Sequence, residues 1–254
     1  MTGLMTGKTV LVTGAGSGIG AATARLMAEH GARVALGYHR DASGAEAVLA
    51  ALPGSGHLVL PVVIDEAESL VAAAAWLDTE FGHLDCLVNS AGSSKRVPHG
   101  DLDALTDEFF DQITRINLRG PFATIRAMLQ LLRKAPDGAS IVNIGSLAAH
   151  TGVGSNIAYV ASKGGISAMS KSLARVLGPQ IRVLTVSPAG VETDFLKGRD
   201  PAVSLRNAET APLKKQTFPE SIAATVLACA ALMPSATGID VIADEGRHLV
   251  GWPL

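Results

Sequence analysis

The chain has 254 residues, of which 48% are hydrophobic and 4% aromatic, and its formal net charge is -2. This composition supplies a sizeable buried core and excludes a disordered chain. A nearly neutral sequence without a Lys/Arg cluster also gives no electrostatic footprint for nucleic acid or for an anionic membrane surface. Because there is no internal repeat, linker or low-complexity block, the sequence predicts one domain over residues 1–254.

Strand-like apolar runs alternate with helical patterns along the whole chain. The predicted strands lie within residues 8–16, 33–38, 57–64, 84–92, 139–146, 181–190 and 237–246. The predicted helices lie within residues 19–32, 43–53, 67–81, 106–132, 158–177 and 219–233. Strands that are apolar throughout and separated by helices indicate a doubly wound α/β fold with a parallel sheet covered on both faces. Such sheets bind ligands at the carboxyl ends of their strands.

The other bulk features point to a cytoplasmic protein that binds small molecules. The N-terminal residues have no charged segment followed by an apolar run, and no stretch reaches transmembrane length, so we expect neither a signal peptide nor a membrane partner. The two cysteines, Cys86 and Cys229, sit in apolar surroundings without metal or redox spacing, and we expect ordinary buried thiols. The seven histidines are scattered, so no metal site is predicted.

A glycine turn follows the first predicted strand. The segment TGAGSGIG places glycines at 14, 16, 18 and 20, where strand passes into helix. Glycine permits a sharp turn with positive φ and leaves the amides at the helix start open to a pyrophosphate. The alternative is that these glycines only allow close packing of helix and strand. Their position in the first βα turn favours a dinucleotide site.

Tyr159 and Lys163 stand four residues apart in the helix predicted at 158–177, so they share one helix face. A neighbouring ammonium favours a phenolate and lowers the pKa of a tyrosine, which could then exchange a proton with an alcohol or a ketone. An isolated pair of this kind is more often a half-buried tyrosine beside a solvated lysine. Ser146, however, ends the preceding strand and should face the same ligand crevice, where its hydroxyl could hold a substrate oxygen.

Over nearly its whole length the sequence resembles the short-chain dehydrogenase/reductase family. TGAGSGIG is similar to that family's T-G-x-x-x-G-x-G turn, NSAG at 89–92 to its N-N-A-G, and YVASK to its Y-x-x-x-K. Asn117, Ser146 and the segment SPAGVET at 187–193 fall where the family has its helix asparagine, its serine and a P-G-x-x-x-T segment. Within the family the sequence is most similar to 3-oxoacyl-carrier-protein reductases.

The resemblance implies roles for these residues and an NAD(P) cofactor. Tyr159 would be the general acid in reduction, Lys163 would lower its pKa and bind the nicotinamide ribose, Ser146 would hold the substrate carbonyl, and Asn117 would anchor a proton-relaying water. Without the resemblance, Asn117 reads as a polar residue that interrupts a helix. The implied cofactor site consists of Gly14, Ser17, Gly18, Ile19, Gly20, Tyr38, His39, Arg40, Val63, Ile64, Asn89, Ala91, Gly92, Tyr159, Lys163, Pro188, Val191 and Thr193.

The end of the second strand bears on the choice between the two nicotinamide cofactors. Tyr38 stands where NAD-preferring relatives usually carry Asp, and His39 and Arg40 follow. A planar guanidinium suits a phosphate, so we expect NADP(H) rather than NAD(H). The alternative is that Arg40 is only a solvated loop charge.

Three positions depart from the family pattern. Val63, followed by Ile64, stands where relatives usually have an adenine-binding Asp, and Asp65 could compensate. Ser90 replaces an asparagine, and Ala189 stands where glycine is usual.

These observations predict an NADP(H)-dependent reductase of a carbonyl, with a 3-oxoacyl thioester as the first substrate to test. The alternatives are an NAD-dependent dehydrogenase of a secondary alcohol, sugar or steroid, and a non-catalytic dinucleotide sensor, in which Tyr159 or Lys163 should be missing.

Residues 194–218 are polar and weakly periodic, and we expect them to be a mobile cover over the substrate. By resemblance the protein would be a homo-oligomer, a tetramer or dimer, with Trp252 packed against another subunit.

Overall fold

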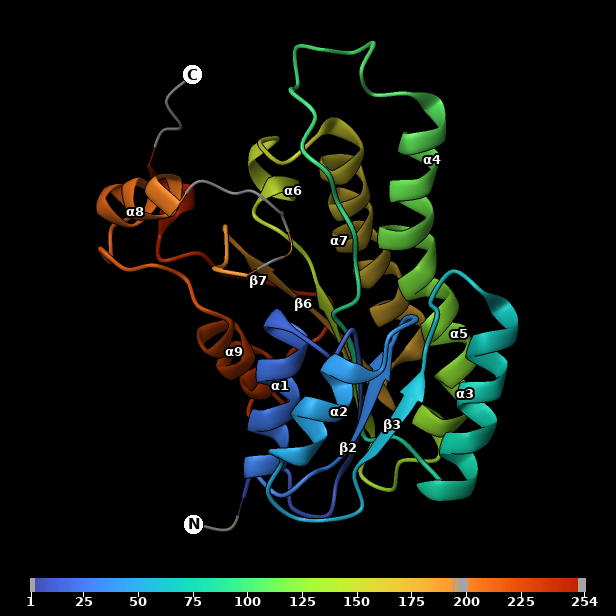
Figure 1. The fold of residues 1–254 in the computed structure, drawn as a ribbon. Helices are drawn as coiled ribbons and strands as arrows, with labels where there is room; N and C mark the ends of the chain where they lie inside the picture. Colours follow the sequence, from blue (N-terminus) through green and yellow to red (C-terminus); the bar gives the residue numbers. More distant parts are fainter. Residues whose placement is uncertain (1–2, 194, 196–200, 251–254) are drawn as a thin grey trace.

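Seven parallel strands form the centre of the structure, in the order β3-β2-β1-β4-β5-β6-β7 (Figure 1). The computed structural model describes residues 3–193, 195 and 201–250, so Trp252 and part of the predicted cover lie outside the described residues. The strands are β1 (Thr9–Thr13), β2 (Arg33–Tyr38), β3 (Leu58–Pro61), β4 (Cys86–Asn89), β5 (Ala139–Ile144), β6 (Ile181–Pro188) and β7 (Asp240–Ala243). This sheet confirms the predicted doubly wound α/β fold.

Helices cover both faces of the sheet (Figure 1). They are α1 (Gly18–Glu29), α2 (Ser43–Ala50), α3 (Ala67–Glu80), α4 (Asp107–Thr114), α5 (Gly120–Arg133), α6 (Ala148–Thr151), α7 (Ile157–Leu177), α8 (Pro201–Thr210) and α9 (Pro219–Ala231), with the π-helix η1 (Arg115–Arg119) and the 3₁₀-helix η2 (Arg247–Leu249). No helix in the described part of the chain is long and apolar enough to cross a membrane.

The alternating side chains of each strand supply two separate cores. Val10 and Val12 of β1 pack in a cluster with residues of α1, α2 and α9. Leu11, between them, packs in a second cluster with residues of α3, α5 and α7. Successive side chains of a strand point to opposite faces, so a strand buried on both faces is apolar at every position.

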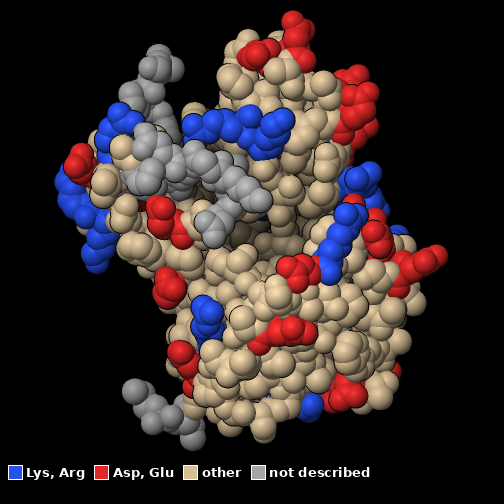
Figure 2. Space-filling model, viewed as in Figure 1, with Lys and Arg blue, Asp and Glu red and all other residues tan. Residues whose placement is uncertain are grey.

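The order in which successive strands are added to the sheet reverses between the neighbouring strands β1 and β4. The first three strands build outward from β1 on one side, and β4 to β7 build outward on the other. Thr13 and Asn89, the last residues of β1 and β4, are register partners at this switch point. Doubly wound folds bind their ligands just beyond such strand ends. In Figure 2 the surface is hollowed near the middle of the view, and Lys/Arg and Asp/Glu side chains are interspersed around it.

The helix predicted over residues 106–132 is interrupted by a π-helical turn. The interruption, η1, lies between α4 and α5 and contains Asn117, which is 1% exposed. Pro121 gives a physical reason, since it lacks the amide hydrogen that an α-helix would donate to the carbonyl of Asn117. Single π-helical turns inside α-helices occur frequently at functional sites.

Candidate active site

The glycine turn of residues 14–20 lies at the carboxyl end of β1 and leads into α1. Gly14 and Gly18 have φ of 66° and 51°, the left-handed region that favours glycine. A Cβ on Gly14 would lie 3.0 Å from Cα of Ala91, and one on Gly18 would lie 3.1 Å from Cγ2 of Thr193. The exposed Ser17 makes no side-chain hydrogen bond to the first turn of α1. The two glycines therefore allow the turn to pack closely against Ala91 and Thr193, and the uncapped amides at the start of α1 are available to an anion.

Ser146, Tyr159 and Lys163 converge from two elements. Ser146 follows β5, and its Oγ accepts a hydrogen bond of 3.2 Å from the backbone N–H of Ala148. Tyr159 lies in the first turn of α7, and the side chain of Ser146 lies close enough to influence its phenol. One turn further on, Nζ of Lys163 donates to the carbonyl of Ile144 at 2.7 Å. The structure thus brings three of the four predicted catalytic residues together at the end of β5.

The pKa values of Tyr159 and Lys163 are both shifted by burial. Burial raises the pKa of the Tyr159 phenol above its ordinary value, and the side chain of Ser146 opposes that rise. Burial lowers the pKa of Lys163 to about 8. Lys163 is not among the causes of the Tyr159 shift, so its expected lowering of that pKa stays a prediction. Removal from water disfavours both charged forms, and Nζ of Lys163 donates to the carbonyl of Ile144 rather than to the phenol oxygen.

Asn117, the fourth predicted residue, uses its carboxamide to hold the backbone of Ser93. Its Nδ2 donates to the carbonyl of Ser93 at 2.8 Å, and its Oδ1 accepts from the N–H of Ser93 at 2.8 Å. A Cβ on Gly92 would lie 3.1 Å from that Oδ1. The carboxamide of Asn117 is therefore engaged on Ser93, and its role in anchoring a water stays a prediction.

Tyr38, His39 and Arg40 lie at the carboxyl end of β2. Tyr38 is half-buried, whereas His39 and Arg40 are exposed. Arg40 forms no hydrogen bond or ion pair with any residue that the structure describes. Its guanidinium is therefore available to an incoming anion.

The residues after β3 are engaged within the protein. Val63 is buried, and its N–H donates to Oγ of Ser69 at 3.0 Å. Ile64 is buried against Gly120. Asp65, which could have compensated for the missing adenine-binding carboxylate, forms an ion pair of 3.3 Å with Arg115. Asp65 is therefore paired within the protein, and the cofactor contacts of Val63 and Ile64 stay predictions.

Thr13 and Asn89 fix the strand ends beneath the crevice. Oγ1 of Thr13 accepts from the N–H groups of Ser90 and Ala91, each at 3.1 Å. Asn89 begins a buried chain of hydrogen bonds across the sheet, donating to Asn143 at 2.8 Å. Asn143 and Thr185 both donate to Oγ of Ser170 on α7, each at 2.9 Å. This chain joins α7, which carries Tyr159, to three strands.

The segment after β6 passes over the glycine turn. Pro188 accepts a hydrogen bond from the N–H of Leu147, Val191 pairs with Thr217, and Thr193 lies against Gly18. The ring of Phe195 lies 6.1 Å from that of Tyr159, centroid to centroid. The remaining predicted cofactor residues, Ile19 and Gly20, lie in the first turn of α1.

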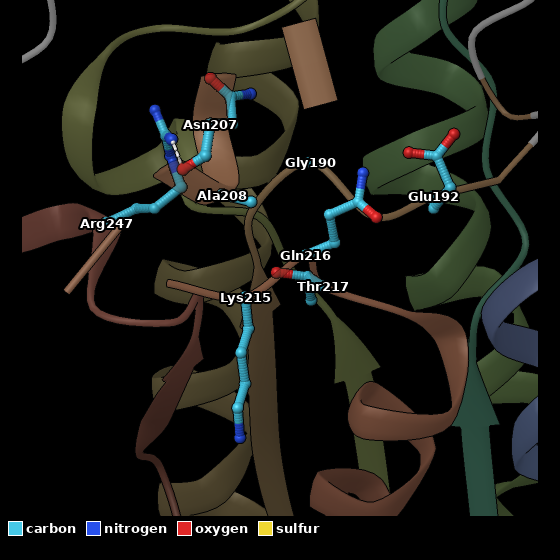
Figure 3. Close-up of a pocket in the computed structure, with 8 residues that line it drawn as sticks. All are labelled: Gly190, Glu192, Asn207, Ala208, Lys215, Gln216, Thr217 and Arg247. Carbon is cyan, nitrogen blue, oxygen red and sulfur yellow. Dashed lines mark hydrogen bonds between the residues drawn. The ribbon is translucent and has the colours of Figure 1, made fainter. Parts of the chain in front are cut away.

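A small pocket lies beside this segment (Figure 3). It is lined by Gly190, Glu192, Asn207, Ala208, Lys215, Gln216, Thr217 and Arg247. Arg247 donates to the carbonyl of Asn207 and to Oγ1 of Thr210, and so holds the carboxyl end of α8. The weak periodicity of residues 194–218 did not reveal that α8 lies within them.

Sequence reasoning also missed Asn156, whose side chain caps α7 and contacts residues 94 and 95. An Asn three residues before Tyr159 is a helix N-cap signal that could have been read. Its second set of contacts is between segments distant in the sequence, and no local pattern reveals those.

The predictions on cysteine and metal chemistry concern residues away from the crevice. Cys86 and Cys229 are both buried, as predicted, and burial raises the pKa of each thiol to about 11. Within the described ranges, no three His, Cys, Asp or Glu residues are placed to hold a metal ion.

Comparison with known proteins identifies the family. Residues 14–248 match the family described as "Enoyl-(Acyl carrier protein) reductase". The chain is 38% identical over 245 residues to D-threitol dehydrogenase of Mycolicibacterium smegmatis, covering 94% of this chain and 92% of the relative. It is 35% identical over 243 residues to a Streptomyces violaceoruber protein described as ketoacyl reductase 2 of the granaticin polyketide synthase, covering 94% and 96%.

A crystal structure from Burkholderia xenovorans, described as a short-chain dehydrogenase/reductase, superposes with a TM-score of 0.89 at 35% identity, covering 96% of this chain and 98% of that one. The chain therefore belongs to the short-chain dehydrogenase/reductase family and is an oxidoreductase that interconverts a carbonyl and an alcohol.

Proposed function

We propose that the protein is an NADP(H)-dependent reductase that converts a carbonyl into a secondary alcohol, with Tyr159 as the general acid. The observation that carries the proposal is the convergence of Ser146, Tyr159 and Lys163 at the end of β5. Homo-oligomeric assembly and a cytoplasmic location stay predictions.

The residues present fit a nicotinamide dinucleotide. The glycine turn at Gly14 and Gly18 has positive φ and leads directly into α1, whose start has no side-chain cap. The pyrophosphate would lie on this turn, and Lys163 would reach the nicotinamide ribose. When bound, the cofactor supplies the hydride that reduces the carbonyl carbon.

The side chains of the chain itself handle the carbonyl oxygen and its proton. Oγ of Ser146 already accepts from the N–H of Ala148, which favours donation of its own hydroxyl proton to the substrate oxygen. Tyr159 then transfers its phenolic proton to that oxygen. The raised pKa of Tyr159 suits this role, because it keeps the phenol protonated at neutral pH. Lys163 stabilises the phenolate that remains, and Asn117 anchors the water that returns a proton.

The preference for NADP(H) rests on Arg40. Its guanidinium is exposed and unengaged by the described residues, at the strand end where the adenosine ribose binds in doubly wound folds. A 2′-phosphate there would gain charge-assisted hydrogen bonds. A 3-oxoacyl thioester is the first substrate to test, and the similarity to a protein described as a ketoacyl reductase supports that choice.

A second candidate is an NAD-dependent dehydrogenase of a polyol, because D-threitol dehydrogenase is among the relatives. Initial rates at the nicotinamide absorbance band would separate the two functions. The assay compares NADPH with NADH on ketones and 3-oxoacyl thioesters, and NADP with NAD on polyols. Reduction of a 3-oxoacyl thioester faster with NADPH supports the proposal, whereas faster polyol oxidation with NAD would replace it by the second candidate.

A further inference from the structure

Asn156 stands at the start of α7, three residues before Tyr159, and its side chain is completely buried. Its Oδ1 accepts from the N–H of Tyr159 at 2.7 Å, which is a helix N-cap. Its Nδ2 donates to the carbonyl of Lys95 at 2.7 Å and to Oγ of Ser94 at 3.2 Å. One carboxamide thus joins the backbone of Tyr159 to the loop that follows β4.

The same loop is held at its other end by Asn117. That side chain binds both the N–H and the carbonyl of Ser93, on the η1 side of the crevice. The two asparagines are 1% and 0% exposed, so water does not compete for these hydrogen bonds. Residues 93–95 therefore form a fixed connection between η1 and the first turn of α7, which we name the 93–95 tie.

We propose that Asn156 is a positioning residue for Tyr159, acting through the 93–95 tie. The proposal rests on the proposed function, because it assigns the tie to the placement of the general acid. Tyr159 and Ser146 come from different elements, α7 and the end of β5, so their mutual position depends on how the first turn of α7 is fixed. A displacement of about 1 Å at a reacting group can cost on the order of 100-fold in rate.

The loop that follows β4 stays attached to the entry of α7 without the Asn156 side chain, so variants at this position should fold. The N–H of Val97 donates to the carbonyl of Ser155 at 2.8 Å, which holds the loop against the α7 entry by backbone alone. The buried Ala158 and Ser162 keep the first turns of α7 packed. Loss of the Asn156 side chain therefore loosens the turn and leaves the fold intact.

Two substitutions separate the cap from the tie. Asn156→Ser keeps an acceptor for the N–H of Tyr159 but is too short to reach Ser94 and Lys95. Asn156→Ala loses both contacts. Thr106→Ala is the matched control, because the side chain of Thr106 caps α4 through the N–H of Phe109, is exposed and lies outside the tie.

The kinetic outcome distinguishes positioning from simple loss of stability. We expect Asn156→Ser to lower kcat by about tenfold with little change in the KM for NADPH, and Asn156→Ala to lower kcat at least as much. Thr106→Ala should lower the melting temperature and leave kcat unchanged. A wild-type kcat in Asn156→Ser would overturn the proposal.

A spectroscopic measurement tests the same placement without turnover. The chain has two tyrosines, so in a Tyr38→Phe background the tyrosinate absorbance reports Tyr159 alone. Adding Asn156→Ser should move the titration midpoint down toward the ordinary value of about 10, because a loosened phenol is better hydrated. A titration midpoint that is the same with and without Asn156→Ser would also overturn the proposal. Circular dichroism at each pH checks that both variants remain folded. If the wild type reduces no carbonyl in the panel, the proposed function fails, and this midpoint alone decides the role of Asn156.

Discussion

Nζ of Lys163 lies 5.7 Å from the centroid of the Tyr159 ring and donates to the carbonyl of Ile144. The lysine forms no ion pair with a described carboxylate, and burial is the cause of its lowered pKa. An ammonium without a counter-charge is costly to bury, and the fold retains it one helical turn from a phenol. A group that must stabilise a transient phenolate needs this arrangement, since a permanent carboxylate partner would neutralise the charge.

Reduction should lose rate as the pH rises through about 8. Lys163 has a pKa of about 8, so its charge is present below that pH and is lost above it. The pKa of Tyr159 is raised, so the phenol stays protonated across the same range. The pH profile of kcat/KM for NADPH reports groups of the free enzyme and should fall above about pH 8. Lys163→Arg remains charged and should show no fall there, whatever its absolute rate. A flat wild-type profile between about pH 7 and about pH 9 would contradict the role given to Lys163.

Arg40→Ala should weaken NADPH far more than NADH. Charge-assisted hydrogen bonds to a phosphate predict a loss of about 10- to 100-fold in NADPH affinity and little change in that of NADH. Nicotinamide fluorescence titration measures both. Arg25→Ala, which removes an exposed arginine from α1, is the control for net charge. Equal losses for the two cofactors would exclude a phosphate contact.

Gly14→Ala should damage both stability and cofactor binding, whereas Gly7→Ala should damage stability alone. Both glycines have φ near 70°, at 66° and 74°, so each substitution places a Cβ in the left-handed region at a cost of about 1–2 kcal/mol. Only Gly14 has a close neighbour, with Ala91 Cα 3.0 Å from the added Cβ, whereas nothing lies within 4 Å of Gly7. Thermal unfolding of the two variants measures the cost of backbone strain. NADPH titration of the same variants shows whether the space at Gly14 is needed for cofactor binding. Identical effects at both positions would show that the turn has no such requirement.

Ser170→Ala should destabilise the protein by about 1–3 kcal/mol, because it leaves Asn143 and Thr185 without their buried acceptor. Ser172→Ala, at an exposed position of the same helix, should change the free energy of unfolding by less than about 0.5 kcal/mol. Urea unfolding of the two variants provides the comparison. A neutral Ser170→Ala would mean that water or another group replaces the hydroxyl.

The fold and the three converging side chains were predictable because their signals are local. A strand, a glycine turn and a helix are adjacent in sequence, and the four-residue spacing of Tyr159 and Lys163 places both on one helix face. Ser146 could be added because parallel strands all end at one edge of the sheet.

The rest depends on contacts between distant segments. The hydrogen bonds of Asn156 to Ser94 and Lys95 span about sixty residues of sequence, and no periodicity records them. The carboxamide of Asn117 could be placed on Ser93 only once the π-helical turn was known. The raised pKa of Tyr159 likewise follows from how much water the folded protein removes, which local sequence does not specify.

Tyr159→Phe tests the central claim most directly, because it removes the phenolic oxygen and leaves the ring in place. General acid catalysis contributes on the order of 10²- to 10⁴-fold, so turnover of the best carbonyl substrate should fall by at least about 100-fold. NADPH affinity, measured by fluorescence titration of the same variant, should stay within about threefold of the wild type, because the ring and Lys163 remain in place. Turnover within about tenfold of the wild type, with NADPH still bound, would contradict the assignment of Tyr159 as the proton donor.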